Sequence, residues 1–467
     1  MKNRYLIKFG TIILLAVAIS SCKKWIDPNI NNDPDSALDA NYNLILPAIE
    51  VNMGYVMGGM DIRGITGMWV QHVRGAARQA STMGKNYNLT EADVNNAWNS
   101  FYNGFMMDIK ILIDKTGSAN PQARGVGKVL MAVALGQASD LWGDIPYTQA
   151  FTGDANLKPA YDSQQSIYTK INTLLTEAIT DLSTASSANI IPLGSTSNDL
   201  IYNGSTTKWI AAARSLRARY AIHLSKKAGV DYTAILADCA AGISSNANDM
   251  QLAFGTTEAN ANPLYEFDIQ RTDVAPSATF AVRAAGDPRF VVFNYNSVDK
   301  KNFGTFYGSI SSPVPFMTYV ETLFIQAEAQ LRKTGPSQAL ANTAYDAAVK
   351  NSLSKFGIPL TTDTATVNST NRWIRDHTTY ATTSTLGPGI LTDRNFQTII
   401  EAKYIALFMQ TEAYNDYRRT GFPVLVPTAG TSVPVRYPYA TDERLYNSAN
   451  VPTGITTSTV LWWMTSK

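Results

Sequence analysis

A stretch near the end of the chain, residues 392–423, constrains the fold more than any other part of the sequence. Its apolar residues recur every three or four positions, a spacing that places them along one face of a helix. The resulting stripe is wide enough to be buried, so we expect other helices to pack against it. The stripe consists of Phe396, Ile399, Ile400, Tyr404, Leu407, Phe408, Thr411 and Tyr414.

Both ends of this stretch carry residues that begin and end helices. Thr392 or Asp393 can cap the start, because a short side-chain oxygen accepts from the first free backbone amides. Gly421 can adopt the left-handed conformation that ends a helix. Arg418 and Arg419 lie in the last turn, where cations interact favourably with the helix dipole. We therefore interpret the two arginines as dipole and ion-pair partners rather than as ligand contacts.

The same periodicity recurs along the chain and predicts a mainly α-helical body. Successive helices form pairs, as in tetratricopeptide-type arrays, although no clean period of about 34 residues establishes true repeats. Three segments lack helical periodicity and are expected to be insertions. We expect mixed loop and helix at residues 60–90, loops with short strands at 245–315, and a second long insertion at 357–391. The predicted helices cover residues 40–57, 90–115, 121–141, 164–183, 206–227, 232–244, 318–333 and 337–356.

The N-terminus has the pattern of a lipoprotein signal peptide. A basic region containing Lys2, Arg4 and Lys8 precedes a short apolar region at residues 9–19, which is too short for a membrane-spanning helix of roughly 20 residues. An apolar residue and two small ones then precede Cys22, as in a bacterial lipobox. We expect Cys22 to be lipidated and to become the new N-terminus, with an ordinary signal peptide as the alternative.

Charge and cysteine content limit which partners and which disulfides we expect for the chain after removal of the signal peptide. Residues 1–21 contain 3 of the 39 basic side chains and none of the 37 acidic ones, so their removal leaves a nearly neutral protein. A neutral balance gives no reason to expect a nucleic-acid partner. Cys239 would be the only cysteine besides the lipidated one, so no internal disulfide can form. We expect Cys239 to pack in a helix as a small apolar residue.

Residues 22–39 form a polar leader between the anchor and a single domain at residues 40–467, in which no linker is apparent. Acidic and amide residues alternate along the leader and partly resemble a calcium-binding loop, but Leu38 occupies the position of the bidentate glutamate. Turn chemistry explains the run equally well. We expect no cofactor, with calcium at the leader as the alternative. The alternating residues are Asp27, Asn29, Asn31, Asp33 and Asp35.

The sequence lacks the patterns that common enzymes require. It has no G-x-S-x-G nucleophile motif, and the glycines at residues 125–129 lack the spacing of a phosphate-binding loop. His72, His223 and His377 are scattered, without the spacing of a metal site. We therefore expect a protein that is not an enzyme. A lipid-anchored glycoside hydrolase stays open, because a pair of catalytic carboxylates cannot be recognised from spacing alone.

Binding is the function that composition favours. Sugars have flat C–H faces, which pack on aromatic rings, and polar edges, which bind amide and guanidinium groups. Loops on a rigid scaffold can present such side chains to a ligand. Core packing is the competing explanation for each aromatic residue, and it is the one we adopt for the helical Trp98 and Trp209. The candidate ligand-binding residues are Trp69, Gln71, Arg74, Tyr87, Tyr307 and Trp373, and further loop aromatics are Tyr265, Tyr295 and Phe306.

Several phrases of the sequence follow the order found in one known family. The run EAKYIALFMQTEAYNDYRRTGFPVL at residues 401–425 resembles the late helix of the SusD/RagB-type nutrient-binding lipoproteins of the Bacteroidetes outer membrane. The lipobox and the leader with DPN and NNDP are also similar to that family, over roughly residues 20–467. Further similar phrases are SDLWGDIPYTQAF (139–151), YNGSTTKWIAAARSLRARYAIHLSK (202–226), GDPRF (286–290), VPVRYPYATDERLYNSANV (433–451) and LWWM (461–464).

The resemblance implies a fold, a partner and a location. The fold is an α-helical body with tetratricopeptide-like helix pairs on one side and long loops on the other. The implied function is nutrient capture at the exterior face of the outer membrane, where such proteins cover a SusC-like TonB-dependent barrel. We expect an oligosaccharide ligand. An oligopeptide, which other members of the family bind, and a helical scaffold without a small ligand are the alternatives.

Overall fold

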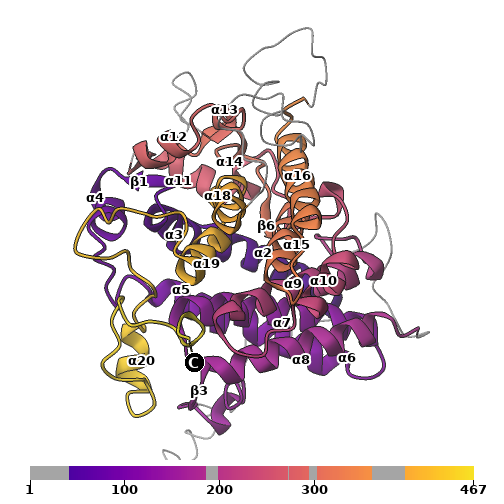
Figure 1. The fold of residues 1–467 in the computed structure, drawn as a ribbon. Coiled ribbons are helices and arrows are strands. Elements are labelled where there is room, and N and C mark those ends of the chain that lie inside the picture. The colour runs from indigo at the N-terminus through magenta and orange to yellow at the C-terminus, as the bar shows by residue number, and fades with distance from the viewer. Residues whose placement is uncertain (1–41, 186–197, 272, 294–301, 360–394, 467) are drawn as a thin grey trace, which may run out of the picture. The chain divides into compact units, whose positions relative to one another are not determined.

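The computed structural model describes residues 42–185, 198–271, 273–293, 302–359 and 395–466 (Figure 1). Several predicted features lie outside these ranges: the leader with Cys22, most of the insertion at 357–391, and the candidates Tyr295 and Trp373. The described body is mainly helical, which confirms the predicted fold class. None of its helices combines the length and apolarity needed to cross a membrane.

Long helices form the scaffold, and most begin with a side-chain cap. Ser163, Ser205, Thr318 and Ser337 each accept a hydrogen bond from a backbone amide in the first turn of the helix that follows, which satisfies one otherwise unpaired donor. The long helices are α2 (Tyr42–Gly58), α6 (Met107–Thr116), α7 (Pro121–Trp142), α8 (Gln164–Leu182), α9 (Thr206–His223), α10 (Tyr232–Ala240), α15 (Tyr319–Arg332), α16 (Gln338–Lys355), α18 (Phe396–Ala406) and α19 (Thr411–Thr420).

These helices pack as successive neighbours, from α6 to α10 and on to α15 and α16. Glycines on α7 permit the close approach: a Cβ atom at Gly136 would lie 2.2 Å from the Tyr220 hydroxyl of α9, and one at Gly125 would lie 2.8 Å from Leu182 of α8. Trp98 and Trp209 are fully packed, as expected, and Cys239 is a buried free thiol.

Shorter elements make up the insertions, and the strands pair only in twos. Three small antiparallel sheets form from β1 (Val73–Gly75) with β5 (Val274–Pro276), β2 (Ile145–Pro146) with β3 (Tyr161–Asp162), and β4 (Met250–Leu252) with β6 (Val314–Met317). The short α-helices are α3 (Ile65–Trp69), α4 (Arg78–Ala80), α5 (Asn95–Asn99), α11 (Pro263–Gln270), α12 (Ala278–Arg283), α13 (Phe290–Phe293), α14 (Gly304–Tyr307) and α20 (Thr441–Tyr446). Single turns of π- or 3₁₀-helix include η2 (Met60–Gly64), η3 (Ser81–Lys85), η4 (Ser100–Met106), η6 (Leu224–Lys226) and η9 (Trp462–Met464).

The stretch at residues 392–423 is not the single helix that its periodicity predicts. It forms α18 and α19, which are separated by a turn where Met409 has a positive φ of 56°. Asn395 rather than Thr392 or Asp393 caps α18, by accepting from the Thr398 amide at 2.9 Å. The predicted C-terminal end is correct, because Gly421 adopts the left-handed conformation.

The turn between α18 and α19 is held by contacts from a distant part of the chain. The Met409 amide donates to Nδ1 of His72 at 3.0 Å, and Met409 O accepts from the Arg63 guanidinium. Met409 also packs on Gly67, where an added Cβ would lie 2.7 Å from its sulfur. The apolar stripe is therefore buried as predicted, but tertiary contacts bend the backbone that carries it.

Candidate functional site

Three predicted site residues lie in one segment, residues 71–87, which the C-terminal loop at 424–428 covers in part. We call these two segments the loop surface. Gln71 Nε2 donates to Val426 O at 2.6 Å, and the Thr428 amide donates to the Tyr87 hydroxyl at 3.0 Å. Arg74 lies on β1 opposite Ala275 of β5, with its side chain exposed. The structure thus brings Gln71, Arg74 and Tyr87 into one structural unit.

The backbone of this segment is unusual. Of the six non-glycine residues with positive φ in the described chain, three lie here: Gln71 (63°), Arg78 (46°) and Tyr87 (57°). Such conformations cost of order 1–3 kcal/mol each and gather at functional sites. The buried Oε1 atom of Gln71 also has no hydrogen-bond partner among the described residues. Strain and an unsatisfied acceptor both favour the loop surface as a binding region.

Two of the predicted ligand contacts are core residues instead. Trp69 is fully buried, its Nε1 donates to Met83 O at 2.9 Å, and its ring packs edge-on against Tyr437. Tyr307 is 1% exposed and lies beneath the Arg63 guanidinium. In this structure neither ring is accessible to a ligand. The expectation that they lie on open loops is wrong, because short helices within the insertions carry them into the core.

The remaining loop aromatics take intermediate positions. Phe306 and Tyr265 are half-buried, and Phe306 packs against Tyr307 and Phe356 at ring distances of 4.9 Å. Tyr87 is also half-buried, so it is the accessible aromatic residue of the loop surface.

A groove that sequence reasoning did not single out lies between α8, α9 and the C-terminal η9. Its volume is about 400 Å³, within the range of small-molecule sites. Trp462 is half-buried at its wall, with Lys227 Nζ 4.7 Å from the ring centre, and α8 contributes the exposed side chains of Gln165 and Asn172. Arg217 also lines the groove, but its guanidinium is held by Asp238 at 2.6 and 2.7 Å.

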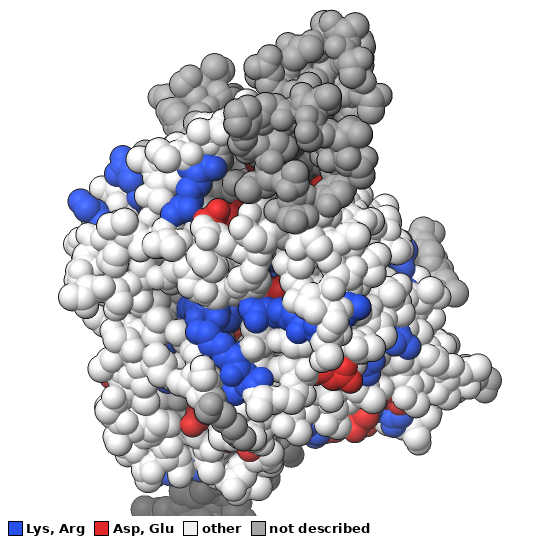
Figure 2. Space-filling view, viewed as in Figure 1, with Lys and Arg blue, Asp and Glu red and all other residues white. Residues whose placement is uncertain are grey.

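Two basic residues, Arg217 and Lys227, line the groove. Figure 2 shows Lys and Arg side chains gathered at the centre of one face of the molecule, with acidic side chains nearby. The phrase LWWM was recognisable only as a family motif. Periodicity cannot tell which of two adjacent tryptophans faces outward, and the structure buries Trp463 while leaving Trp462 accessible.

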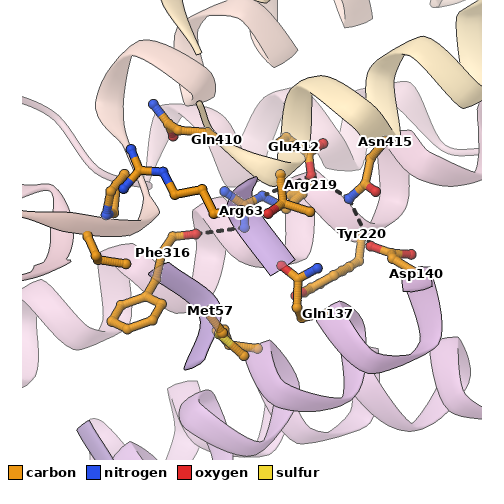
Figure 3. Close-up of a pocket in the computed structure, with 14 residues that line it drawn as sticks. Met57, Arg63, Gln137, Asp140, Arg219, Tyr220, Phe316, Gln410, Glu412 and Asn415 are labelled. Atoms are coloured by element: carbon orange, nitrogen blue, oxygen red, sulfur yellow. Dashed lines mark hydrogen bonds and ion pairs between the residues drawn. The ribbon is translucent and has the colours of Figure 1, made fainter. Parts of the chain in front are cut away.

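A second cavity, of about 50 Å³, lies deep between α7, α9, η2 and α19 (Figure 3). It is too small for a sugar. Beside it, His223 Nε2 lies 2.7 Å from Glu412 Oε1, and the Arg219 guanidinium binds Glu321. Burial alone would lower the pKa of His223, but Glu412 and Asp140 outweigh it and raise the pKa. Burial likewise opposes ionisation of Glu412, yet His223 and Arg219 hold its pKa well below the usual value.

The predicted ion-pair role of the last-turn arginines is confirmed for Arg419. Its guanidinium binds Glu328 of α15 at 2.5 and 2.6 Å and Asp416 at 2.6 Å. Arg418 instead donates to the carbonyl oxygens of Asp140 and Val435, and its guanidinium lies 3.9 Å from the Tyr414 ring centre. These buried charges join helices to one another. Within the described residues, no cluster of His, Cys, Asp and Glu could hold a metal ion.

Comparison with known proteins assigns the fold. It is similar to that of a SusD/RagB family protein from Bacteroides thetaiotaomicron, with a TM-score of 0.72 and 21% identity over 92% of this chain and 100% of the other. A chitin-binding SusD homolog from Flavobacterium johnsoniae aligns with a TM-score of 0.70 and 22% identity, over 91% of this chain and 97% of the other. A SusD homolog from Bacteroides fragilis aligns with a TM-score of 0.69 and 20% identity, over 92% of this chain and 100% of the other.

The sequence itself matches a family model. Among curated proteins, none matches the chain. The SusD-like model described as "starch-binding associating with outer membrane" matches residues 43–311 and 307–440, which is most of the chain. With the shared fold, this match shows that the chain belongs to the SusD-like family of outer-membrane-associated binding proteins.

Proposed function

We propose that this protein is a surface lipoprotein that binds an oligosaccharide and delivers it to a SusC-like TonB-dependent transporter in the outer membrane. The family description supports saccharide binding at the outer membrane, and a relative of the same fold binds chitin. The observation that carries the proposal for this chain is the loop surface. It combines an accessible aromatic ring, Tyr87, with an exposed guanidinium group, Arg74, on a strained backbone.

In this proposal each residue of the loop surface has a chemical role. The Tyr87 ring stacks on the C–H face of a sugar, as aromatic residues do with flat apolar surfaces. The exposed Arg74 donates hydrogen bonds to hydroxyl groups. Gln71 is buried, so its role is to hold the C-terminal loop at Val426 and not to contact the sugar. Trp373, which lies outside the described residues, remains a proposed contact.

The test is ligand binding by the secreted, unlipidated Cys22→Ala protein, first on a glycan and peptide array and then by calorimetry with the best ligand. In this background, Tyr87→Ala should weaken binding by roughly 1–3 kcal/mol, the effect of losing an aromatic anchor. Tyr87→Phe is the matched control, because it keeps the ring and removes only the hydroxyl that accepts from Thr428. Its binding should stay close to that of the parent.

The outcomes separate the alternatives. Loss of binding in Trp462→Ala, with Tyr87→Ala and Arg74→Ala unchanged, would move the site to the groove between α8 and α9. Array signals from peptides alone would replace the oligosaccharide with an oligopeptide.

We also propose that binding occurs without catalysis. Incubation with the bound glycan should leave its chain-length profile unchanged. Product release that a single carboxylate substitution abolishes would identify a lipid-anchored glycoside hydrolase instead.

Membrane attachment is proposed to depend on Cys22. The Cys22→Ala protein should leave the membrane fraction, and it should not incorporate a fatty-acid analogue. The wild-type protein should co-purify with a TonB-dependent barrel from detergent-solubilised outer membranes. Continued labelling of the Cys22→Ala protein would show that the anchor lies elsewhere.

A further inference from the structure

The groove at Trp462 continues beyond the part described above. An adjoining hollow of about 540 Å³ extends to the start of α10 and shares Asn172, Arg217 and Lys227 with it. Because the two share residues, they form one groove, which residues of α8, of α9 and of the segment between η6 and α10 line. We call it the helical groove. It has room for more than one unit of a chain molecule.

The side of α8 that lines the helical groove carries uncharged polar residues. Gln165, Thr169, Asn172 and Thr176 follow one another at intervals of three or four positions, so they lie along one face of the helix, and all four are exposed. The side-chain amides of Gln165 and Asn172 make no hydrogen bond to another described residue. About 10.5 Å of helix separates these two amides. Each can both donate and accept, which suits the hydroxyl groups of a sugar.

Trp462 supplies an aromatic surface at the end of the groove away from α10. Its neighbours Leu461 and Trp463 are buried and hold the backbone of η9 in place. Lys227 Nζ lies 4.7 Å from the centre of the Trp462 ring and donates to Thr465 Oγ1 at 3.0 Å. The half-buried ring is therefore fixed before a ligand arrives, so little side-chain freedom is lost on binding.

The carboxylates of the helical groove already have partners. Among the described residues, none lines the part at Trp462. In the adjoining part, Asp238 binds Arg214 and Arg217, and Asp231 caps α10 by accepting from two backbone amides. The groups that remain for a ligand are amides and hydroxyls beside one indole ring. This combination fits an uncharged molecule that is rich in hydroxyl groups.

We infer that the helical groove is a second saccharide-binding site, separate from the loop surface. The inference rests on the proposed function, because it takes the same class of ligand. The Trp462 ring packs on the C–H face of one sugar unit, and Gln165 and Asn172 bind hydroxyl groups of units further along the chain. The two sites share no residue, so each can be removed without the other.

The test is calorimetric titration of the unlipidated Cys22→Ala protein with tetrasaccharides derived from starch and from chitin. With the tetrasaccharide that binds, this parent protein should take up two molecules. Asn172→Ala and Trp462→Ala should each weaken one of the two sites by at least about fivefold, while Tyr87→Ala should weaken the other. Thr173→Ala is the matched control. Thr173 is an exposed neighbour of Asn172 that does not line the groove, and its removal should change neither site.

The outcomes separate this inference from the proposed function. A single bound molecule that Tyr87→Ala releases, with the two groove variants unchanged, would overturn the groove site and leave the proposed function standing. Absence of saccharide binding would overturn both. Binding that responds only to the groove variants would support the groove and overturn the loop surface. If Trp462→Ala does not fold, Asn172→Ala decides, because its exposed side chain can be removed without opening the core.

Discussion

His72 joins two segments that lie 332 residues apart in the chain. Its Nδ1 accepts from the Met409 amide at 3.0 Å, so the proton of the neutral ring is on Nε2, which donates to Tyr404 O at 3.0 Å. Burial, and secondarily the charge of Arg63, lower the pKa of His72 to about 3. A second proton on this ring would abolish the bond to Met409.

The first prediction concerns acid stability. The folded-state pKa of His72 lies below its unfolded value near 6.5, so the unfolded chain takes up the extra proton. Stability should therefore fall as the pH drops below about 6.5, by up to about 1.4 kcal/mol per pH unit for this group. In His72→Gln, the unfolding free energy from urea titrations should fall less steeply between about pH 6.5 and 5.

His223 provides a control, because its pKa is shifted in the direction opposite to that of His72. Its raised pKa gives stability that is fully present below the unfolded value and is lost as the pH rises through the folded value. His223→Gln should therefore leave the slope between about pH 6.5 and 5 close to that of the parent, and should remove the loss of stability that His223 causes as the pH rises above about 6.5. Identical pH slopes for the parent and His72→Gln would show that His72 does not stay neutral.

Trp69 and Tyr87 show what residue type alone can and cannot predict. Both are aromatic residues in a segment without periodicity, so the sequence offered no basis for telling core from surface. The structure buries Trp69 within α3 and leaves Tyr87 half-buried at the end of the segment. The difference arises from partners such as Tyr437, which lie far away in the sequence.

The second prediction follows from that contrast. Trp69→Ala should lower the free energy of unfolding by about 3–5 kcal/mol, because it leaves a cavity and an unpaired Met83 carbonyl. Tyr87→Ala should change it by much less. Urea denaturation of both variants is the measurement. A Trp69→Ala protein of normal stability would place its ring outside the core.

At the scale of elements, the periodicity of apolar residues predicted well which residues are buried, but it predicted poorly where a helix is interrupted. It gave α7, α8, α15 and α16 to within a few residues, because each is a regular helix. Of these, α8 has one buried stripe, whereas α7 is buried on almost all sides. It joined α18 and α19 into one helix, since both halves of the stripe are buried. The break depends on His72 and Arg63, which no local pattern can reveal.

The third prediction tests the link between α15 and α19. Glu328 is buried between Arg419 and Arg332. Burial alone would raise the pKa of Glu328, but the charge of Arg419 outweighs burial and lowers it. Glu328→Gln removes the charge and keeps the shape. It should cost about 3 kcal/mol of unfolding free energy, since removing one partner leaves a buried charge poorly compensated.

The matched control is Glu177→Gln. Glu177 pairs with Lys128 at 2.9 Å, but its side chain is 48% exposed. Exposed pairs contribute about 0–1 kcal/mol. Equal effects of the two substitutions in urea titrations would contradict the structural importance assigned to Glu328.

For the whole molecule, the order of motifs along the sequence predicted the family, which the family model confirms. The geometry of the candidate binding site could not be predicted in the same way. Residues 71–87 meet residues 424–428 only after folding, and the groove at Trp462 requires α8, α9 and the C-terminal segment together. Site geometry of this kind is a property of tertiary contacts.

The fourth prediction concerns the C-terminal segment, residues 433–463. The Tyr437 amide donates to Leu141 O and its hydroxyl to Asp61 O, while Trp142 Nε1 donates to Pro438 O. A chain that ends at Gly430 should therefore lack a cooperative thermal transition, because it exposes the ends of α7 and η2. A chain that ends at Met464 should melt like the full-length protein. A cooperative transition in the shorter chain would show that the segment is dispensable.

The contact of His72 with Met409 also has a consequence for synthesis. The early helices cannot complete their packing until the ribosome has translated nearly the whole message, so the order of synthesis is not the order in which the core closes. If the chain is exported as we propose, this delay keeps it open for passage through a narrow secretion channel. The same distant contact that bends one turn would then hold back folding until export is finished.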